Sequence, residues 1–170
     1  MAWTLRPATA TDAEQLARAV ADAFAAYREF APADWRPPSF EQELQLVEQG
    51  LARPDVWVLM AEEEGRLAGH VGIRSAATAT FSSDEPGLAH FWQLFVHPDW
   101  HGSGLAVALH DEAIEEARAR SYRAIRLFAA AGQARARRFY EREGWTATGP
   151  AFMLDGFGLD TVEYRRELSS

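Results

Sequence analysis

The 170-residue sequence contains no cysteine, no lysine and no asparagine, and these absences exclude several kinds of chemistry. Without cysteine the chain has no disulfide, no thiolate nucleophile and no Cys-ligated zinc or iron–sulfur site. Without lysine it lacks the phosphate-binding residue of the P-loop NTPases. It also lacks the amine that Schiff-base and pyridoxal-phosphate enzymes use as a nucleophile.

Charge and hydropathy narrow the class of protein further. The formal net charge is −8 and every one of the 17 basic residues is arginine, which argues against a nucleic-acid partner. The same acidity suits a cationic substrate such as an amine. Because no apolar run is long enough for a membrane span and the N-terminus does not resemble a signal peptide, we expect a cytoplasmic protein with no membrane partner. The length fits one domain over residues 1–170.

Hydrophobic periodicity predicts a mixed α/β fold in the order β-α-α-β-β-β-α-β-α-β-β. We expect a mostly antiparallel sheet of about six to seven strands, flanked by about four helices, with a strand–helix–strand crossover at its centre. The expected strands cover residues 3–6, 56–61, 67–73, 89–96, 124–128, 152–154 and 161–166. The expected helices begin near residue 12 and near residue 39, and cover residues 104–120 and 134–143.

A glycine-rich turn joins the strand that ends at Val96 to the next helix. Gly102 and Gly104 open that helix, so free backbone N–H groups and a helix N-terminus converge on one point, which suits a phosphate or pyrophosphate. Such a turn also occurs for purely steric reasons. A dinucleotide-binding fingerprint fits badly, because its third small residue would fall at Val107.

Two segments together resemble the GNAT superfamily of N-acetyltransferases. The family's acetyl-CoA motif, [Gln/Arg]-x-x-Gly-x-[Gly/Ala], is similar to His101-Gly102-Ser103-Gly104-Leu105-Ala106. A later family motif, Asn-x-x-Ala-x-x-Phe-Tyr-x-x-x-Gly-Phe, is similar to Gln133-x-x-Ala136-x-x-Phe139-Tyr140-x-x-x-Gly144-Trp145. Two positions depart from the family: His101 replaces Gln or Arg, and Gln133 replaces Asn. His101 offers fewer donors than the arginine fork, so coenzyme affinity is expected to be lower or pH-dependent.

The resemblance implies an enzyme that transfers an acetyl group from acetyl-CoA to a primary amine, by direct attack in a ternary complex. A small-molecule amine is the preferred acceptor, with a protein N-terminus or lysine as an alternative. Two other classes stay open: an acyl-CoA-binding sensor without turnover, and a nucleotide-binding oxidoreductase. The resemblance also makes a homodimer possible. It assigns the coenzyme to Phe95, Val96, His101, Gly102, Ser103, Gly104, Leu105, Ala106, Gln133, Ala136 and Phe139.

Two residues are expected to move protons. The resemblance implies that Tyr140 donates a proton to the departing thiolate, a role that a phenol of pKa about 10 can fill. Counting back from Val96 places His90 where some family members carry a glutamate base, and an imidazole titrating near neutral pH suits that role. A water chain is the alternative base. Strand alternation predicts that His90, Trp92, Leu94 and Val96 share one face.

The acceptor amine is expected between the first two helices and the C-terminal hairpin. Its candidate walls are Tyr27, Phe30, Trp35, Trp92, Phe152 and Asp155, although a turn role also fits Asp155. No metal is expected. His97 and His101 are four residues apart, but Pro98 prevents a helix there and no third ligand has suitable spacing.

Overall fold

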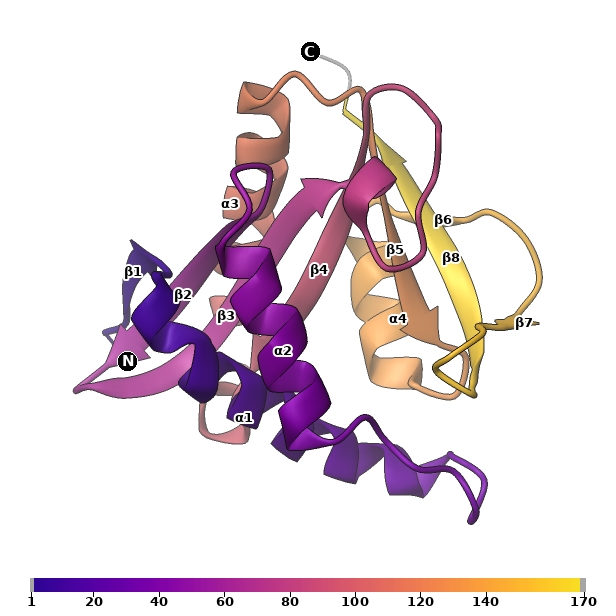
Figure 1. The fold of residues 1–170 in the computed structure, drawn as a ribbon, viewed down its shortest axis with the longest axis horizontal. Helices are drawn as coiled ribbons and strands as arrows, with labels where there is room; N and C mark the ends of the chain where they lie inside the picture. The colour runs from indigo at the N-terminus through magenta and orange to yellow at the C-terminus, as the bar shows by residue number, and fades with distance from the viewer. Residues whose placement is uncertain (1, 169–170) are drawn as a thin grey trace.

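The computed structural model describes residues 2–168 as a twisted sheet covered by helices on both faces (Figure 1). The strands are β1 (Thr4–Pro7), β2 (Trp57–Glu63), β3 (Arg66–Ser75), β4 (Leu88–Val96), β5 (Ala124–Ala130), β6 (Thr146–Ala147), β7 (Phe152–Met153) and β8 (Asp160–Glu167). The α-helices are α1 (Ala13–Ala23), α2 (Phe40–Leu51), α3 (Leu105–Ala119) and α4 (Ala134–Arg142). The short 3-10 helices that bear on the site are η2 (Phe24–Glu29) and η3 (Ala76–Thr78). The expected mixed α/β fold is confirmed.

The strands form one eight-stranded sheet in the order β1-β2-β3-β4-β5-β8-β6, with β7 also pairing with β8. The sequence did not predict β6, which covers residues 146–147. This strand pairs with β8 over two residues only, too few for a hydrophobic period to be recognised. All neighbours are antiparallel except β4 and β5, which run parallel. The helix α3 makes the crossover between them, as parallel neighbours require.

Two hydrophobic clusters lie on opposite faces of the sheet. The larger cluster packs α3 and α4 against the sheet through residues such as Leu109, Ile114 and Tyr140. The smaller cluster packs α1 and α2 through Leu16 and Val47. In Figure 1, α1 and α2 cross in front of β2 and β3, whereas α3 and α4 lie behind the sheet. The front of β5 and β8 is therefore not covered by an α-helix.

A β-bulge changes the direction of side chains in the second half of β4. The register with β3 shifts between His70 and Gly72, and Gln93 has a φ of +56°. β4 has one residue more than β3 over this stretch, so the side chains of β4 beyond the bulge point to the opposite face from the one that simple alternation predicts. Trp92 packs with the α1–α2 cluster, while Leu94 and Val96 pack with the α3–α4 cluster. The expectation that His90, Trp92, Leu94 and Val96 share one face is therefore wrong.

The connection from β3 to β4 covers the front of β5. It contains η3, and Figure 1 shows it folding over β5 and β8 on the side of α1 and α2. The backbone carbonyl of Phe81, in this connection, accepts a hydrogen bond from the Arg126 side chain of β5. Among residues 2–168, no helix has both the length and the apolar character needed to cross a membrane.

Candidate active site

The central feature of the site is the opening between β4 and β5. The two strands pair at three positions only, ending where His90 meets Arg126. Beyond that point β4 stays paired with β3 and β5 stays paired with β8, so each strand presents one unpaired edge to the gap. Unpaired backbone N–H and C=O groups need partners. The edge of β4 that includes Phe95 and Val96 is thus suited to an extended ligand with amide groups of its own.

The glycine turn lies at the open end of this gap. Gly102 and Gly104 have φ values of +77° and +87°, which only glycine adopts without strain. A Cβ built on either glycine would meet no heavy atom within 4 Å, so the space above the turn is free. The amides of Leu105 and Ala106 begin α3, where helical N–H groups have no intrahelical partner. The turn therefore forms a compact anion site.

Buried contacts hold this turn in place. Trp100 is 3% exposed, and its indole N–H donates to a carboxylate oxygen of Glu63 at 2.6 Å. The Ser103 hydroxyl donates to the carbonyl of Trp100 at 2.6 Å and accepts from the amide of Leu105 at 3.3 Å. Ser103 thus links the buried tryptophan to the first turn of α3.

His101 connects the turn to α4. Its Nε2 lies 3.0 Å from the carbonyl oxygen of Val96, and its Nδ1 lies 2.9 Å from Nη1 of Arg135. Because the carbonyl only accepts and the guanidinium only donates, Nε2 carries the proton and Nδ1 is the acceptor. Both ring nitrogens are engaged within the protein. The imidazole holds Arg135 beside the anion site, and no sequence motif had marked this arginine.

The helix α4 places Tyr140 in the core behind the gap. Its ring makes edge contacts with Phe91 and Trp145 at centroid distances of 6.1 and 5.9 Å. Burial, followed by the nearby phenol of Tyr27, raises the pKa of Tyr140 well above its usual range. Tyr140 therefore keeps its proton at neutral pH. Ala136 and Phe139, on the same helix, pack against the same cluster.

The start of α4 contacts the segment that follows α1. The Tyr27 hydroxyl donates to the side-chain oxygen of Gln133 at 3.1 Å, and burial raises the pKa of Tyr27 to about 12. The ring of Phe30 lies against Gly132, where a Cβ would approach ring atoms to 2.6 Å. Gln133, expected at the coenzyme, and two of the expected wall residues are therefore brought together here.

His90 lies in a row with two arginines across the sheet. Arg74 is its partner on β3 and Arg126 its partner on β5. Burial, together with the positive charges of Arg126 and Arg74, lowers the pKa of His90 to about 3. The ring is therefore neutral and weakly basic at pH 7. The role of His90 as base stays a prediction, and this environment opposes it.

A second polar group beside the bulge had not been predicted from the sequence. The amide nitrogen of Gln93 donates to Glu43 of α2 at 3.3 Å. Glu43 is 4% exposed, and burial raises its pKa, partly offset by this hydrogen bond. His70 lies on the other side of Gln93 and is fully buried, with no hydrogen-bond partner for its ring nitrogens among residues 2–168. No sequence motif indicated this cluster. The backbone feature that marks it, the positive φ of Gln93, is seen only in the structure.

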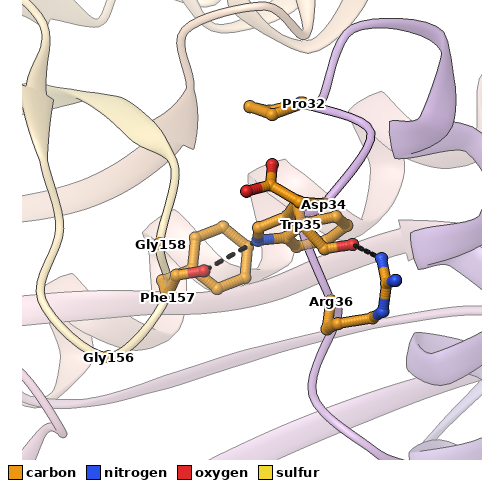
Figure 2. Close-up of a pocket in the computed structure, with 7 residues that line it drawn as sticks. All are labelled: Pro32, Asp34, Trp35, Arg36, Gly156, Phe157 and Gly158. Carbon is orange, nitrogen blue, oxygen red and sulfur yellow. Dashed lines mark hydrogen bonds between the residues drawn. The ribbon is translucent and has the colours of Figure 1, made fainter.

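The remaining expected wall residues lie in three places. Trp35 and Phe157 contact each other edge to face and line the same open hollow, and the Trp35 indole N–H donates to the Phe157 carbonyl at 2.9 Å (Figure 2). Phe152 is 40% exposed on β7, and Asp155 lies exposed in the turn after it. Trp92 fills the space between α2 and β3, because a Cβ on Gly72 would meet its ring at 3.0 Å. Trp92 is thus chiefly a packing residue.

One group of possible metal ligands occurs among the described residues, away from the gap. It consists of His110, Asp111 and Glu143. The Nε2 of His110 accepts from the Trp145 indole at 3.0 Å, and its Nδ1 lies 2.9 Å from Asp111. Both ring nitrogens are therefore engaged in hydrogen bonds, which hold the buried His110 between Trp145 and the exposed Asp111.

The fold and the site together define a protein that can hold an extended, phosphate-bearing ligand between two diverging parallel strands. The model of the Acetyltransferase (GNAT) family matches residues 20–145, and the chain therefore belongs to this family. The predicted membership is confirmed.

Individual relatives agree with this assignment. A protein of Archaeoglobus fulgidus described as an uncharacterized N-acetyltransferase is 32% identical over 90 residues, which cover 53% of this chain and 60% of that protein. The chain thus matches less than two thirds of the length of that relative.

Solved structures show the same fold. The yncA protein of Salmonella typhimurium, solved with its cofactor acetyl-CoA, has a TM-score of 0.73 and 21% identity, covering 100% of this chain and 96% of that one. The paiA N-acetyltransferase of Thermoplasma acidophilum, in complex with coenzyme A, has a TM-score of 0.70 and 16% identity, covering 98% and 99%.

Proposed function

We propose that the protein, as one domain over residues 1–170, transfers an acetyl group from acetyl-CoA to the primary amine of a small molecule. The observation that carries this proposal is the convergence of three features at one gap. They are the unpaired edge of β4, the open glycine turn before α3, and the phenol of Tyr140, whose ring contacts Phe91 of β4. Family membership and the coenzyme-bound structural neighbours support it.

The chain's own groups suggest how the coenzyme is held. Backbone groups on the unpaired edge of β4, around Phe95 and Val96, pair with the pantetheine arm, as a neighbouring strand would. The amides that follow Gly102 and Gly104 receive the pyrophosphate. Arg135, held by His101, supplies the positive charge that the first motif position provides elsewhere in the family. Arg135 of α4 therefore compensates for the histidine that replaces glutamine or arginine at position 101.

The chemistry follows from the same arrangement. The amine nitrogen attacks the thioester carbonyl carbon, while an amide near Phe95 stabilises the developing oxyanion. The carbon–sulfur bond then breaks, and the sulfur takes the proton of Tyr140. The attacking nitrogen gives up its own proton to a base. A neutral His90 or a water chain is the candidate for that role.

Calorimetric titration with acetyl-CoA, CoA and NAD tests the first step. Binding of both CoA species in the micromolar range, with none of NAD, supports the proposal and leads to thiol-release assays on an amine panel. Binding without turnover of any amine would favour an acyl-CoA sensor. If no CoA species bound, both the acetyltransferase hypothesis and the acyl-CoA sensor hypothesis would be wrong.

Arg135 gives a sharper test of the anion site. We expect Arg135→Gln to weaken acetyl-CoA binding about tenfold, because one charge-assisted hydrogen bond is worth about 1.5–3 kcal/mol. The matched control is Arg118→Gln, which removes the same charge from the last turn of α3, far from the glycine turn. Equal affinities for the two variants would remove Arg135 from the coenzyme site.

A further inference from the structure

The face of the sheet that packs against α1 and α2 carries a row of two arginines and a histidine. Arg74, His90 and Arg126 are cross-strand neighbours on β3, β4 and β5. Neighbouring strands lie about 4.8 Å apart, so the three side chains stand close together on one face. The row lies where β4 and β5 begin to separate, on the face that α1 and α2 leave open over β5. It therefore lies beside the innermost end of the gap.

The two guanidinium groups are poorly satisfied by the protein. Arg126 is 6% exposed, and its described contacts are a hydrogen bond to the carbonyl of Phe81 and a stacking contact 4.9 Å from the centre of the Phe128 ring. Arg74 donates to the carbonyl of Thr78 at 2.5 Å. The Nε atoms of both arginines are buried without a partner, and so is Nδ1 of His90.

Neither arginine makes an ion pair with a carboxylate within the described part of the chain, although the charges of Asp55 near Arg74 and of Glu163 and Glu85 near Arg126 act on them from further away. Each is instead surrounded by groups that desolvate it, and burial lowers the pKa of both side chains. Taking a charge out of water without a partner costs several kcal/mol. A sheet centre that keeps two such charges on either side of His90 is therefore suited to an anion from outside the chain. Arg74 and His90 are partly buried, whereas Arg126 is buried under the connection from β3 to β4.

Aromatic side chains flank the row. The ring of Phe128 lies 5.9 Å from that of His90, 6.0 Å from Phe81 and 6.1 Å from Phe152. These rings provide an apolar wall next to the charged groups. A ligand that fits both has an anionic group for the arginines and an apolar part for the rings.

We propose that the acceptor is a small amine that also carries an anionic group, a carboxylate or a phosphate, and that Arg74 and Arg126 bind this group. The proposal rests on the acetyltransferase function and names its substrate class. Despite the net charge of −8, the acceptor site is positively charged. The acceptor is then an amino-acid-like molecule, and the exposed Asp155 has no part in holding it.

A panel of acceptors that differ in one group tests this directly. Phenylalanine, phenylalaninamide and phenethylamine compare a carboxylate with a neutral amide and with hydrogen. O-phosphoethanolamine and ethanolamine compare a phosphate with a hydroxyl. We expect the anionic member of at least one set to have a kcat/KM at least tenfold above its neutral partners. The set that discriminates identifies the anion, and equal values in both sets overturn the proposal.

Variants of the row separate binding from folding. Arg126→Gln should lower the ratio of kcat/KM for the preferred anionic acceptor to kcat/KM for its neutral analogue by tenfold to a hundredfold, and should leave acetyl-CoA affinity within about twofold. Arg74→Gln, at a less buried position, should act in the same direction. Arg118→Gln is the control. A parallel loss for anionic and neutral acceptors would overturn the proposal.

A product-binding measurement distinguishes failure of this proposal from failure of the proposed function. With CoA bound, N-acetylphenylalanine should raise the melting temperature more than N-acetylphenylalaninamide, and O-phospho-N-acetylethanolamine more than N-acetylethanolamine. Arg126→Gln should abolish the larger shift. If acetyl-CoA binds and neutral amines are acetylated as well as anionic ones, the function stands and the anion site does not. If no CoA species binds, the proposed function itself fails.

Discussion

Arginine has two contrasting environments in this protein. Arg6, at the edge of the sheet, donates to both Asp12 and Glu62 at 2.8 Å, and Asp12 also accepts from the amide of Thr9 at 2.7 Å. Arg74 and Arg126, at the centre of the sheet, donate to backbone carbonyls and have buried Nε atoms without partners.

The comparison separates stability from function. The Arg6 group is complete within the chain, so it ties β1, β2 and the start of α1 together. The central pair makes no direct ion pair among the described residues, and burial of its charges costs free energy in the unliganded protein. Buried groups that a fold leaves unsatisfied are often part of a functional site. We therefore expect substitutions at the two places to act on different measured quantities.

The largest contrast is expected between Arg6→Gln and Arg126→Gln in unfolding experiments. Arg6→Gln should lower the free energy of unfolding by about 2 kcal/mol, because it leaves the buried carboxylate of Asp12 without its ion-pair partner. The partial exposure of Arg6 weakens the ion pair and keeps the loss from being larger. Arg126→Gln should leave the free energy of unfolding unchanged or raise it. Denaturant titration of both variants at pH 7 provides the measurement. A larger loss for Arg126→Gln would mean that the central arginines are structural.

The pH dependence of stability sharpens the first half of the comparison. Hydrogen bonds from Arg6 are the main cause that lowers the pKa of Asp12 from 3.8 to about 2. A lowered carboxyl pKa adds stability that is present above pH 4 and is lost as the pH falls towards 2. The difference in unfolding free energy between wild type and Asp12→Asn should therefore be about 2 kcal/mol at pH 6 and should shrink on acidification. A difference that does not depend on pH would contradict the ion pair.

Unlike Arg74 and Arg126, Tyr140 donates no hydrogen bond from its side chain to another residue among those described, so its proton is available. We expect Tyr140→Phe to lower kcat tenfold or more, with the dissociation constant of acetyl-CoA nearly unchanged, since only the proton donor is lost. Thiol-release kinetics and calorimetry on one preparation give both quantities. Full activity in this variant would remove the general-acid assignment.

The smallest effect is expected at His90. Because its pKa is about 3 in the free protein, His90 is already deprotonated throughout the range from pH 5 to 8. His90→Gln should therefore leave the acid limb of the kcat/KM profile in place, although sequence reasoning alone predicts a flatter limb. A limb that disappears in the variant would show that His90 titrates near neutrality and that the guanidinium charges beside it are balanced.

The sequence predicted most of the fold for identifiable reasons. Ser39 and Gln42 form the capping box that starts α2, and the glycines at 102 and 104 mark the turn before α3. Local signals of this kind act within a few residues, so they can be recognised without the tertiary structure. The two-residue β6 and the bulge at Gln93 escaped, because each depends on a strand far away in the sequence.

The site divides in the same way. The sequence by itself determined the family, the glycine turn before α3 and the position of Tyr140, since these are contiguous motifs whose backbone geometry follows from glycine, proline and helix periodicity. Only the tertiary structure decided which side chains lie beside the gap between β4 and β5. It brought Arg135 to His101, Glu43 to Gln93, and Arg74 and Arg126 to His90. Burial and charge are sums over neighbours from several strands, and strand pairing, which no single segment encodes, chooses those neighbours.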